Sequence, residues 1–174
     1  MDSLTAHFQS ALEHSFIDKT TESNELYKAK LLVNQDEMGR MVLNDLLDEL
    51  ATCKEFFFAV AFITESGLLA IKTILADLAK RDIRGRIITS NYLYFNSSKM
   101  FKELLKLKNV DVRITEMDGF HAKGYSFTHE GYETMILGSS NLTIKALKVN
   151  CEWNLKLNSL VNGELIQSMK QNFE

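Results

Sequence analysis

An almost unbroken apolar run from Glu55 to Ile63 (EFFFAVAFI) constrains the fold of this chain more than any other stretch. Its length is that of a β-strand, and it falls well short of the roughly 18 apolar residues needed to span a membrane. Strands with a continuous apolar sequence are typical of the centre of a sheet that is covered on both faces. We therefore expect this run to be a central strand.

Strand-like and helix-like segments alternate around this run as far as residue 116. The other strand-like segments of this part are 29–34, 84–90 and 110–116. The helical segments, in which apolar residues recur at helical spacing, are 38–52, 67–80 and 97–106. We expect Ser66 to cap the second of these helices. The alternation predicts an α/β domain with a largely parallel sheet.

The pattern changes after the turn at Asp118-Gly119. Residues 121–128 and 132–138 are expected to form two strands joined by a hairpin loop, in which Gly131 suits a positive φ. The segments that follow are a short helix over 142–149, an alternating strand over 152–158 and a helix over 165–173. In that strand Trp153 is expected to face the core. The predicted fold is α/β, with a mixed, mostly parallel sheet of about seven strands flanked by helices.

Residues 1–24 are expected to form a separate N-terminal part. Residues 2–15 have the apolar spacing of an amphipathic helix, and the stretch that follows is a polar arm. Residues 25–174 then form one domain, which is large enough for a substantial core. The last helix has no terminating residue, which favours a fragment of a longer protein.

The overall composition gives no general reason to bind nucleic acid, because the formal net charge is −3. The basic residues around 80–86 and 99–108 are interpreted as solvated surfaces or, alternatively, as a DNA track. Tyr92, Tyr94 and Phe95 are candidates for base stacking or for covering the core. The sequence has no membrane-spanning run and no signal-peptide pattern, and its two cysteines are not at metal-ligand spacing. A cytoplasmic protein with free thiols is therefore expected.

Two short motifs carry the side chains that could do chemistry. The first, Phe120-His121-Ala122-Lys123-Gly124-Tyr125, would place an imidazole and an ammonium group on one face of a strand, roughly 7 Å apart. The second, Gly138-Ser139-Ser140-Asn141, adds a hydroxyl and an amide if the two strands pair as a hairpin. A cation beside a titratable imidazole, with short polar side chains nearby, suits a bound phosphate.

These motifs resemble the H-x-K…G-S-x-N signature of the phospholipase D superfamily. With Phe62–Leu68 and Asn150–Asn154, they are similar to one branch of it, the phospholipase D-like nuclease module at the N-terminus of bacterial DEAD/DEAH-type superfamily 2 helicases. The resemblance covers roughly residues 25–174. It implies a DNA phosphodiesterase that needs no metal or other cofactor and that is joined to a helicase region. Any ATP-dependent activity would belong to that region, since this chain has no G-x-x-x-x-G-K-[ST] loop.

The resemblance also implies a role for each site residue. His121 would attack phosphorus to form a phosphohistidine, or would protonate the leaving group, and Lys123 would neutralise charge on the phosphoryl oxygens. Ser139 and Asn141 would donate hydrogen bonds to those oxygens. Glu152 would accept a hydrogen bond from the imidazole and so fix its tautomer and orientation.

The family reaction uses two motif histidines, whereas only one of the four histidines of this chain, His121, begins an H-x-K triplet. His7 and His14 lie in the N-terminal part, and His129 is expected at the tip of the hairpin. A second copy of the chain is therefore expected to complete the site, in a symmetric homodimer with both His121 side chains facing one phosphate.

One position departs from the family pattern. The pattern has an aspartate five residues after the lysine, and this chain has Thr128 there. Lipid hydrolysis is therefore less expected, because lipid-acting members keep the whole pattern. Two other functions stay open: a catalytically weak module for nucleic-acid binding or dimerisation of a helicase, and a hydrolase of phospholipids or other small phosphodiesters.

Overall fold

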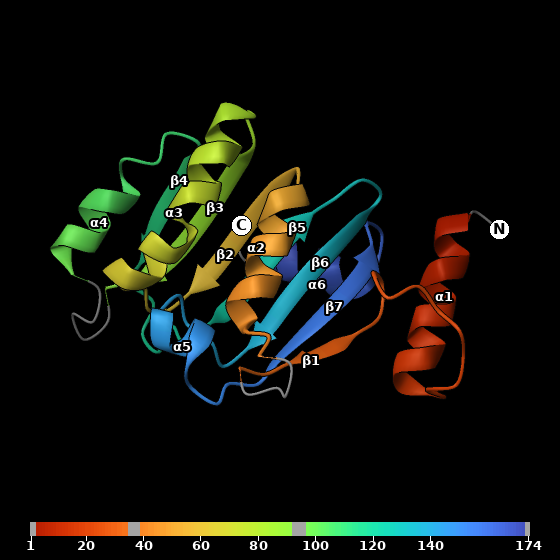
Figure 1. The fold of residues 1–174 in the computed structure, drawn as a ribbon. Coiled ribbons are helices and arrows are strands. Elements are labelled where there is room, and N and C mark those ends of the chain that lie inside the picture. Colours follow the sequence, from red (N-terminus) through yellow and green to blue (C-terminus); the bar gives the residue numbers. More distant parts are fainter. Residues whose placement is uncertain (1–2, 35–38, 92–96, 173–174) are drawn as a thin grey trace.

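The structure is a computed structural model that describes residues 3–34, 39–91 and 97–172. Its seven strands form one mixed sheet in the order β1-β7-β6-β5-β2-β3-β4 (Figure 1). The strands are β1 (Lys30–Leu32), β2 (Glu55–Val60), β3 (Arg84–Ser90), β4 (Val110–Thr115), β5 (Lys123–Thr128), β6 (Tyr132–Gly138) and β7 (Asn154–Leu160). The prediction of a seven-stranded mixed sheet flanked by helices is confirmed, with the apolar run near its centre in β2.

The helices follow the predicted order, with some changes at their ends. They are α1 (Ser3–Phe16), α2 (Val42–Thr52), α3 (Glu65–Lys80), α4 (Ser98–Leu104), α5 (Ile144–Lys148) and α6 (Glu164–Asn172). The prediction that Ser66 caps α3 was wrong, because the Thr64 side chain accepts the Gly67 N–H at 3.1 Å and places Ser66 in the first turn. The predicted start of α2 at Met38 lies outside the described residues. No helix in the described ranges is long and apolar enough to cross a membrane.

The prediction of a mostly parallel sheet was wrong. Only β2–β3 and β3–β4 are parallel pairs, and the other four neighbouring pairs of the described sheet are antiparallel. The βαβ alternation sets the direction of β2, β3 and β4 alone. After β4 the chain crosses back and inserts β5 beside β2 in the opposite direction, and the hairpin then makes β6 antiparallel to β5.

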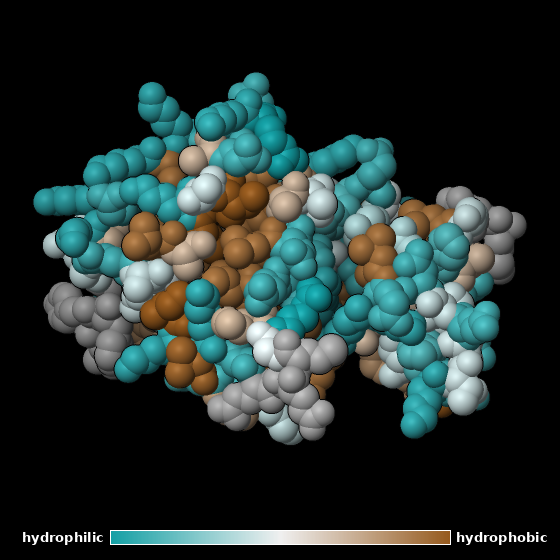
Figure 2. Space-filling model, viewed as in Figure 1, coloured by the Kyte–Doolittle hydropathy of each residue, from teal (hydrophilic) through white to brown (hydrophobic). Residues whose placement is uncertain are grey.

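Most of the core lies on the face of the sheet that is covered by α2, α3 and α5 (Figure 1), called here the α2–α3 face. Phe56 and Phe58 of β2 point to this face and are fully buried against α2 and α3 residues such as Leu50 and Ile71. Figure 2 shows apolar side chains gathered between α2 and α3, surrounded by hydrophilic ones. These helices are therefore held to the sheet by apolar burial along one side of each helix.

The opposite face of the sheet, called the α6 face, is covered less completely. Helix α6 lies on it, where Ile166 is fully buried and Lys170 forms an ion pair with Glu133 of β6. A separate apolar cluster on the β2–β3 part of this face has only three buried members, Ala59, Ala61 and Phe120. The α6 face is thus open over part of the sheet.

Strand β7 turns its polar residues inward, contrary to the predicted orientation. Asn154 and Lys156 are buried, whereas Trp153, just before the strand, is 67% exposed. The ammonium group of Lys156 can be buried because it forms ion pairs with the carboxylates of Asp45 and Glu49 on α2. The prediction that Trp153 faces the core was therefore wrong.

His129 lies in the loop between β5 and β6, as predicted, and its side chain is turned into the protein. Its ring is buried, bonded through Nε2 to Glu49 at 2.7 Å and stacked on Tyr132 at 4.7 Å between centroids. Gly131 turns the same loop with a φ of 79°, as predicted. The loop is therefore anchored beneath α2 by a histidine that is far from the motif residues.

The N-terminal helix α1 is attached to the β6 side of the sheet by aromatic contacts. Phe8 and Tyr27 lie 4.7 Å apart between ring centroids, and Tyr27 contacts Tyr132 edge to face at 5.3 Å. The polar arm after α1 forms turns, as expected. The division of the chain at residue 24 stays a prediction.

Candidate active site

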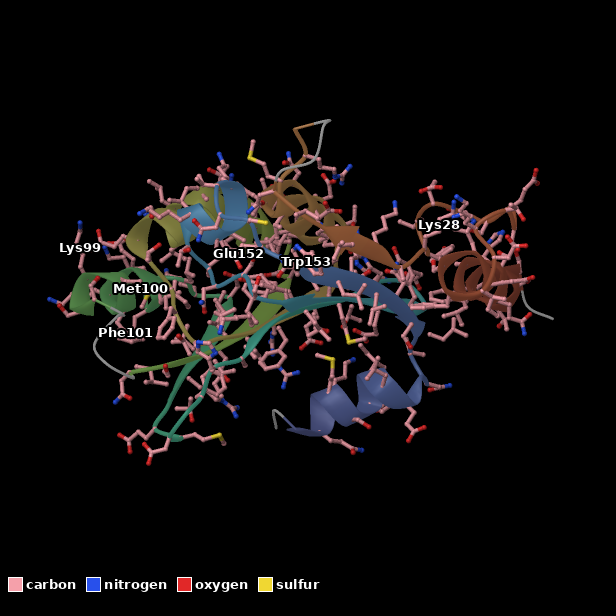
Figure 3. All side chains as sticks on the ribbon, turned by 90° about the horizontal axis from the view of Figure 1, so that it is seen from below. Lys28, Lys99, Met100, Phe101, Glu152 and Trp153 are labelled. Atoms are coloured by element: carbon pink, nitrogen blue, oxygen red, sulfur yellow. The ribbon has the colours of Figure 1, made fainter. Side chains whose placement is uncertain are left out.

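All five predicted site residues lie at one end of the sheet. His121 precedes β5 and Lys123 begins it, Ser139 and Asn141 follow β6, and Glu152 precedes β7. Because β6 runs antiparallel to both neighbours, its end meets the beginnings of β5 and β7. Figure 3 looks from the side of this end, with Glu152 and Trp153 next to each other on the segment that enters β7. The strand order therefore collects the two motifs in one place.

His121 is exposed and is not part of the strand, which differs from the prediction that it shares a strand face with Lys123. Its ring contacts Phe62 edge to face, with centroids 5.9 Å apart. The Lys123 ammonium group turns back and donates a hydrogen bond to the His121 carbonyl at 2.8 Å. The imidazole is thus presented at the surface while the lysine braces the backbone that carries it.

Lys123 is half-buried beneath the surface of the site. Burial lowers the pKa of its ammonium group, and the negative charge of Glu152 acts in the opposite direction. The two side chains are therefore close enough to interact electrostatically, with no ion pair between them. A partly desolvated cation at this depth interacts more strongly with a phosphate than one in open water.

Glu152 is bonded differently from the prediction. Its carboxylate accepts hydrogen bonds from the Ser139 hydroxyl and from the Asn150 side-chain amide, the latter at 3.2 Å. The Ser139 N–H donates to the Trp153 carbonyl at 3.1 Å, and the Ser139 hydroxyl accepts the Trp153 N–H at 3.1 Å. Among the described residues no hydrogen bond joins Glu152 to His121, so Glu152 orients Ser139 here and not the imidazole.

Asn141 holds the site to the end of β2. Its side-chain oxygen accepts the Phe62 N–H at 3.1 Å, and the next residue, Leu142, bonds the Phe62 carbonyl at 3.1 Å. Its amide NH₂ makes no hydrogen bond with any described residue. That group is therefore left as a donor for a ligand oxygen.

The first turn of α3 packs directly on this loop. A Cβ atom added to Gly67 would lie 2.0 Å from the carbonyl oxygen of Leu142. No side chain fits in that space, so glycine permits the close approach of helix and loop. The position of Asn141 depends on this contact.

Two residues to which the sequence analysis gave no role, Asn154 and Tyr125, hold the loop at Ser140. The Ser140 N–H donates to the Asn154 side-chain oxygen at 3.2 Å, and the Asn154 NH₂ donates to the Ser140 hydroxyl at 2.8 Å. The buried Tyr125 hydroxyl donates to the Ser140 carbonyl at 2.9 Å, and burial raises its pKa. An asparagine within an alternating strand was the only local sign of this role.

Thr128, where the family pattern has an aspartate, is far from these residues. It ends β5 while Lys123 begins it, which corresponds to roughly 17 Å along the strand. Its hydroxyl donates to Glu133 at 3.0 Å. The departure from the pattern is therefore outside the site.

Tyr92, Tyr94 and Phe95 lie outside the described residues. Within the described ranges, no three His, Cys, Asp or Glu side chains gather as a metal site would require.

Comparison with protein families identifies the chain. The profile of the family described as "Cardiolipin synthase, PLD-like domain" matches residues 46–174. The chain belongs to this phospholipase D-like family. Comparison with curated protein sequences gives no significant match.

Three solved structures have a similar fold. NucT from Helicobacter pylori superposes with a TM-score of 0.66 at 22% identity, over 84% of this chain and 92% of that one. Nuc from Salmonella typhimurium, a phospholipase D family member, gives a TM-score of 0.60 at 16% identity, over 83% and 91%. Phosphatidylserine synthase from Haemophilus influenzae gives 0.64 at 16% identity, over 82% of this chain and 37% of that one.

Proposed function

We propose that this phospholipase D-like chain is a metal-independent phosphodiesterase that cleaves DNA through a phosphohistidine on His121. The observation that carries the proposal is the convergence of both motifs, from three strands, at one end of the sheet. The family membership supports phosphodiester chemistry. DNA as the substrate is supported by the resemblance to the helicase-linked branch.

The reaction has two balanced steps. An imidazole nitrogen of His121 attacks phosphorus, the P–N bond forms, and the P–O bond to the leaving group breaks as a second histidine gives that oxygen a proton. Water then attacks the phosphohistidine and gives a proton to the second histidine, and the P–N bond breaks to release the phosphomonoester. Lys123 and the Asn141 amide NH₂ would stabilise the phosphoryl oxygens in both steps.

The second histidine is proposed to be the His121 of another copy of the chain. His121 is exposed, and the other histidine of the domain beyond the N-terminal part, His129, is buried against Glu49. A two-fold axis beside His121 would place both imidazoles on opposite sides of one phosphate. The homodimer therefore completes one shared site.

Hydrolysis of bis(p-nitrophenyl) phosphate in excess EDTA tests the chemistry. His121→Ala is expected to lower the rate by roughly ten-thousand-fold, with an unchanged circular dichroism spectrum. His7→Ala, which removes an exposed histidine of α1, is the matched control and should keep full activity. Turnover that survives in His121→Ala, or that requires a divalent metal, would contradict the proposal.

Mixing the wild-type chain with His121→Ala tests the shared site. If two His121 side chains serve one phosphate and the subunits exchange, activity should fall as the square of the wild-type fraction. A linear fall would show that each copy works alone. Binding of DNA without any cleavage would identify a binding module, and cleavage of phosphatidylcholine but not of DNA would identify a lipid hydrolase.

We also propose that the chain is the N-terminal module of a helicase-containing protein. This rests on the resemblance over roughly residues 25–174 and not on any structural contact. The coding sequence downstream of residue 174 tests it directly. A superfamily 2 helicase region is expected there, and its absence would overturn this part of the proposal while leaving the phosphodiesterase chemistry intact.

A further inference from the structure

The open part of the α6 face contains a cleft that reaches His121. The cavity has a volume of about 660 Å³ and extends over β2, β3 and β4 to the segment before β5. Its volume lies within the roughly 300–1,000 Å³ that is common for small-ligand sites. The proposed nucleophile is thus part of the wall of a cavity large enough for a nucleotide.

The floor of the cleft is apolar and follows from the strand register. Phe57 and Ile88 point to the α6 face from β2 and β3, and Phe120 and Ala122 close the end next to His121. Phe57, Ile88 and Ala122 are only partly buried. Partly exposed apolar side chains indicate a binding surface. Next to the proposed nucleophile, we expect this surface to pack against a planar ring of the substrate.

The rim of the cleft carries two arginines. The Arg86 guanidinium lies over the Phe57 ring at 5.3 Å from its centroid, and its nearest carboxylate, Glu55, is 3.7 Å away. The buried Nε of Arg86 has no hydrogen-bond partner among the described residues. On the neighbouring strand, Arg113 donates through Nε to Asp111 at 3.1 Å. Arg86 and Arg113 both line the cavity, so an arginine side chain borders it on each of these two strands.

The charges of the rim balance, since each arginine has a carboxylate close by. A site for a second bare phosphate would be expected to have an excess of positive charge. An apolar floor with hydrogen-bond donors and acceptors at its edge suits a nucleobase and its sugar better. The cleft therefore suits the base and sugar of a nucleotide. His121, at its end, is the residue expected to contact the phosphate.

We infer that this cleft binds the nucleoside that is attached to the scissile phosphate, with the base on the Phe57–Ile88 floor and Arg113 at its edge. The inference rests on the proposed function, because it assumes that the phosphate lies at His121. It explains how a chain with a negative net charge can select nucleotide substrates. Recognition comes from the apolar floor and its polar rim and not from a basic surface.

Two substrates with the same leaving group test the inference. Thymidine 5′-(p-nitrophenyl phosphate) and methyl p-nitrophenyl phosphate both release p-nitrophenolate, and only the first carries a nucleoside. The ratio of their kcat/KM values therefore reports nucleoside binding and is independent of the chemical step. The wild-type chain is expected to prefer the nucleoside substrate by about tenfold or more.

Two tryptophan variants of β4 separate the cleft from the rest of the strand. Thr115→Trp fills the cleft, because Thr115 lines it and pairs in register with Ser90 on the α6 face. Ile114→Trp is the matched control, since the neighbouring residue points to the other face and is already 50% exposed. Thr115→Trp is expected to abolish the preference for the nucleoside substrate, and Ile114→Trp to keep it. Arg113→Ala should reduce the preference several-fold.

The outcomes distinguish this inference from the proposed function. An unchanged preference in Thr115→Trp, or an equal loss of activity on both substrates together with loss of the dimer, would overturn the cleft assignment and leave the chemistry standing. If the wild-type chain cleaves neither substrate, the proposed function fails. Titration with thymidine 5′-monophosphate then decides the cleft separately: binding that is lost in Thr115→Trp and kept in Ile114→Trp supports it, and any other result overturns it.

Discussion

The Thr128 hydroxyl donates a hydrogen bond to a Glu133 carboxylate oxygen 3.0 Å away on the neighbouring strand. The two residues are register partners across β5 and β6, and the other Glu133 oxygen is bound by Lys170 of α6. Where the family pattern has an aspartate on β5, this chain therefore has a carboxylate on β6. The Glu133 carboxylate joins the sheet to α6, and it lies at the end of β5 that is remote from Lys123.

Restoring the family residue is expected to harm the protein. Thr128→Asp would place a second carboxylate against Glu133, which is 1% exposed, with only Lys170 to compensate. We expect the free energy of unfolding to fall by about 2 kcal/mol or more, because like charges oppose each other in a buried position. The phosphodiesterase rate per folded molecule should be unchanged.

Urea unfolding and activity assays on the same samples check this expectation. Thr128→Asn, which is neutral and of the same shape as the aspartate, is the control and should be less destabilising. A gain in the rate constant of Thr128→Asp would show that the aspartate position acts on the site in spite of the distance between them.

Gly67 offers a second test, of the contact that positions Asn141. In Gly67→Ala the new methyl group would meet the Leu142 carbonyl at 2.0 Å, and both partners are backbone-anchored. We expect the helix and loop to separate, with a loss of about 1–3 kcal/mol in unfolding free energy. Activity should decrease further than the unfolded fraction explains. The neighbouring Ser66→Ala should have little effect on either quantity, and an equally active Gly67→Ala would show that the loop position is not critical.

Segments with one clear period could be predicted from the sequence, and strand neighbours could not. The predicted bounds of β3 and β6 agree with Arg84–Ser90 and Tyr132–Gly138. The spacing of apolar residues indicates which face of a strand is covered. It does not indicate which other strand pairs with it in the sheet. The direction of β5 beside β2 depends on a crossover that no local pattern records.

The site shows the same limit at the level of side chains. The hairpin was enough to predict that His121 and Ser139 come to one end of the sheet. The partner of Glu152 was not predictable, because it depends on the path of the two residues that precede β7. Lys156 is buried because Asp45, 111 residues earlier, faces it. An ion pair with a residue far away in the sequence thus allows the polar face of the strand to be the buried one. The sequence of the strand itself gives no sign of this.

The pH dependence of the reaction provides a third prediction. Lys123 must be protonated to stabilise the phosphoryl oxygens, so activity should fall as the pH rises through its pKa. Burial lowers that pKa, and the Glu152 charge partly opposes the effect. Glu152→Gln removes the opposing charge and should move the alkaline limb of the rate profile to lower pH. Glu164→Gln, on α6, is the control and should leave the limb in place. A shift toward higher pH in Glu152→Gln would contradict the assignment.

The buried Glu49 carboxylate of α2, which pairs with His129 and Lys156, predicts how the stability of the protein depends on pH. Burial raises the pKa of Glu49, but hydrogen bonds and charge from His129 and Lys156 outweigh burial and leave the pKa below its ordinary value. A carboxyl group with a lowered pKa stabilises the folded state above its unfolded pKa, and the contribution is lost as the pH falls through the folded value. Unfolding free energy should therefore decrease in acid.

Urea unfolding between about pH 3 and pH 7 tests this group. Glu49→Gln should flatten the acid decrease, whereas Asp77→Asn, at an exposed pair with Arg81, should retain it. Lys156→Met leaves the buried carboxylates of Asp45 and Glu49 without their shared cation, and is expected to cost about 3–5 kcal/mol at neutral pH. Because the Glu49 carboxylate becomes neutral on protonation, the cost should shrink in acid. A cost that is the same at both ends of the pH range would mean that Lys156 contributes by packing and not by charge.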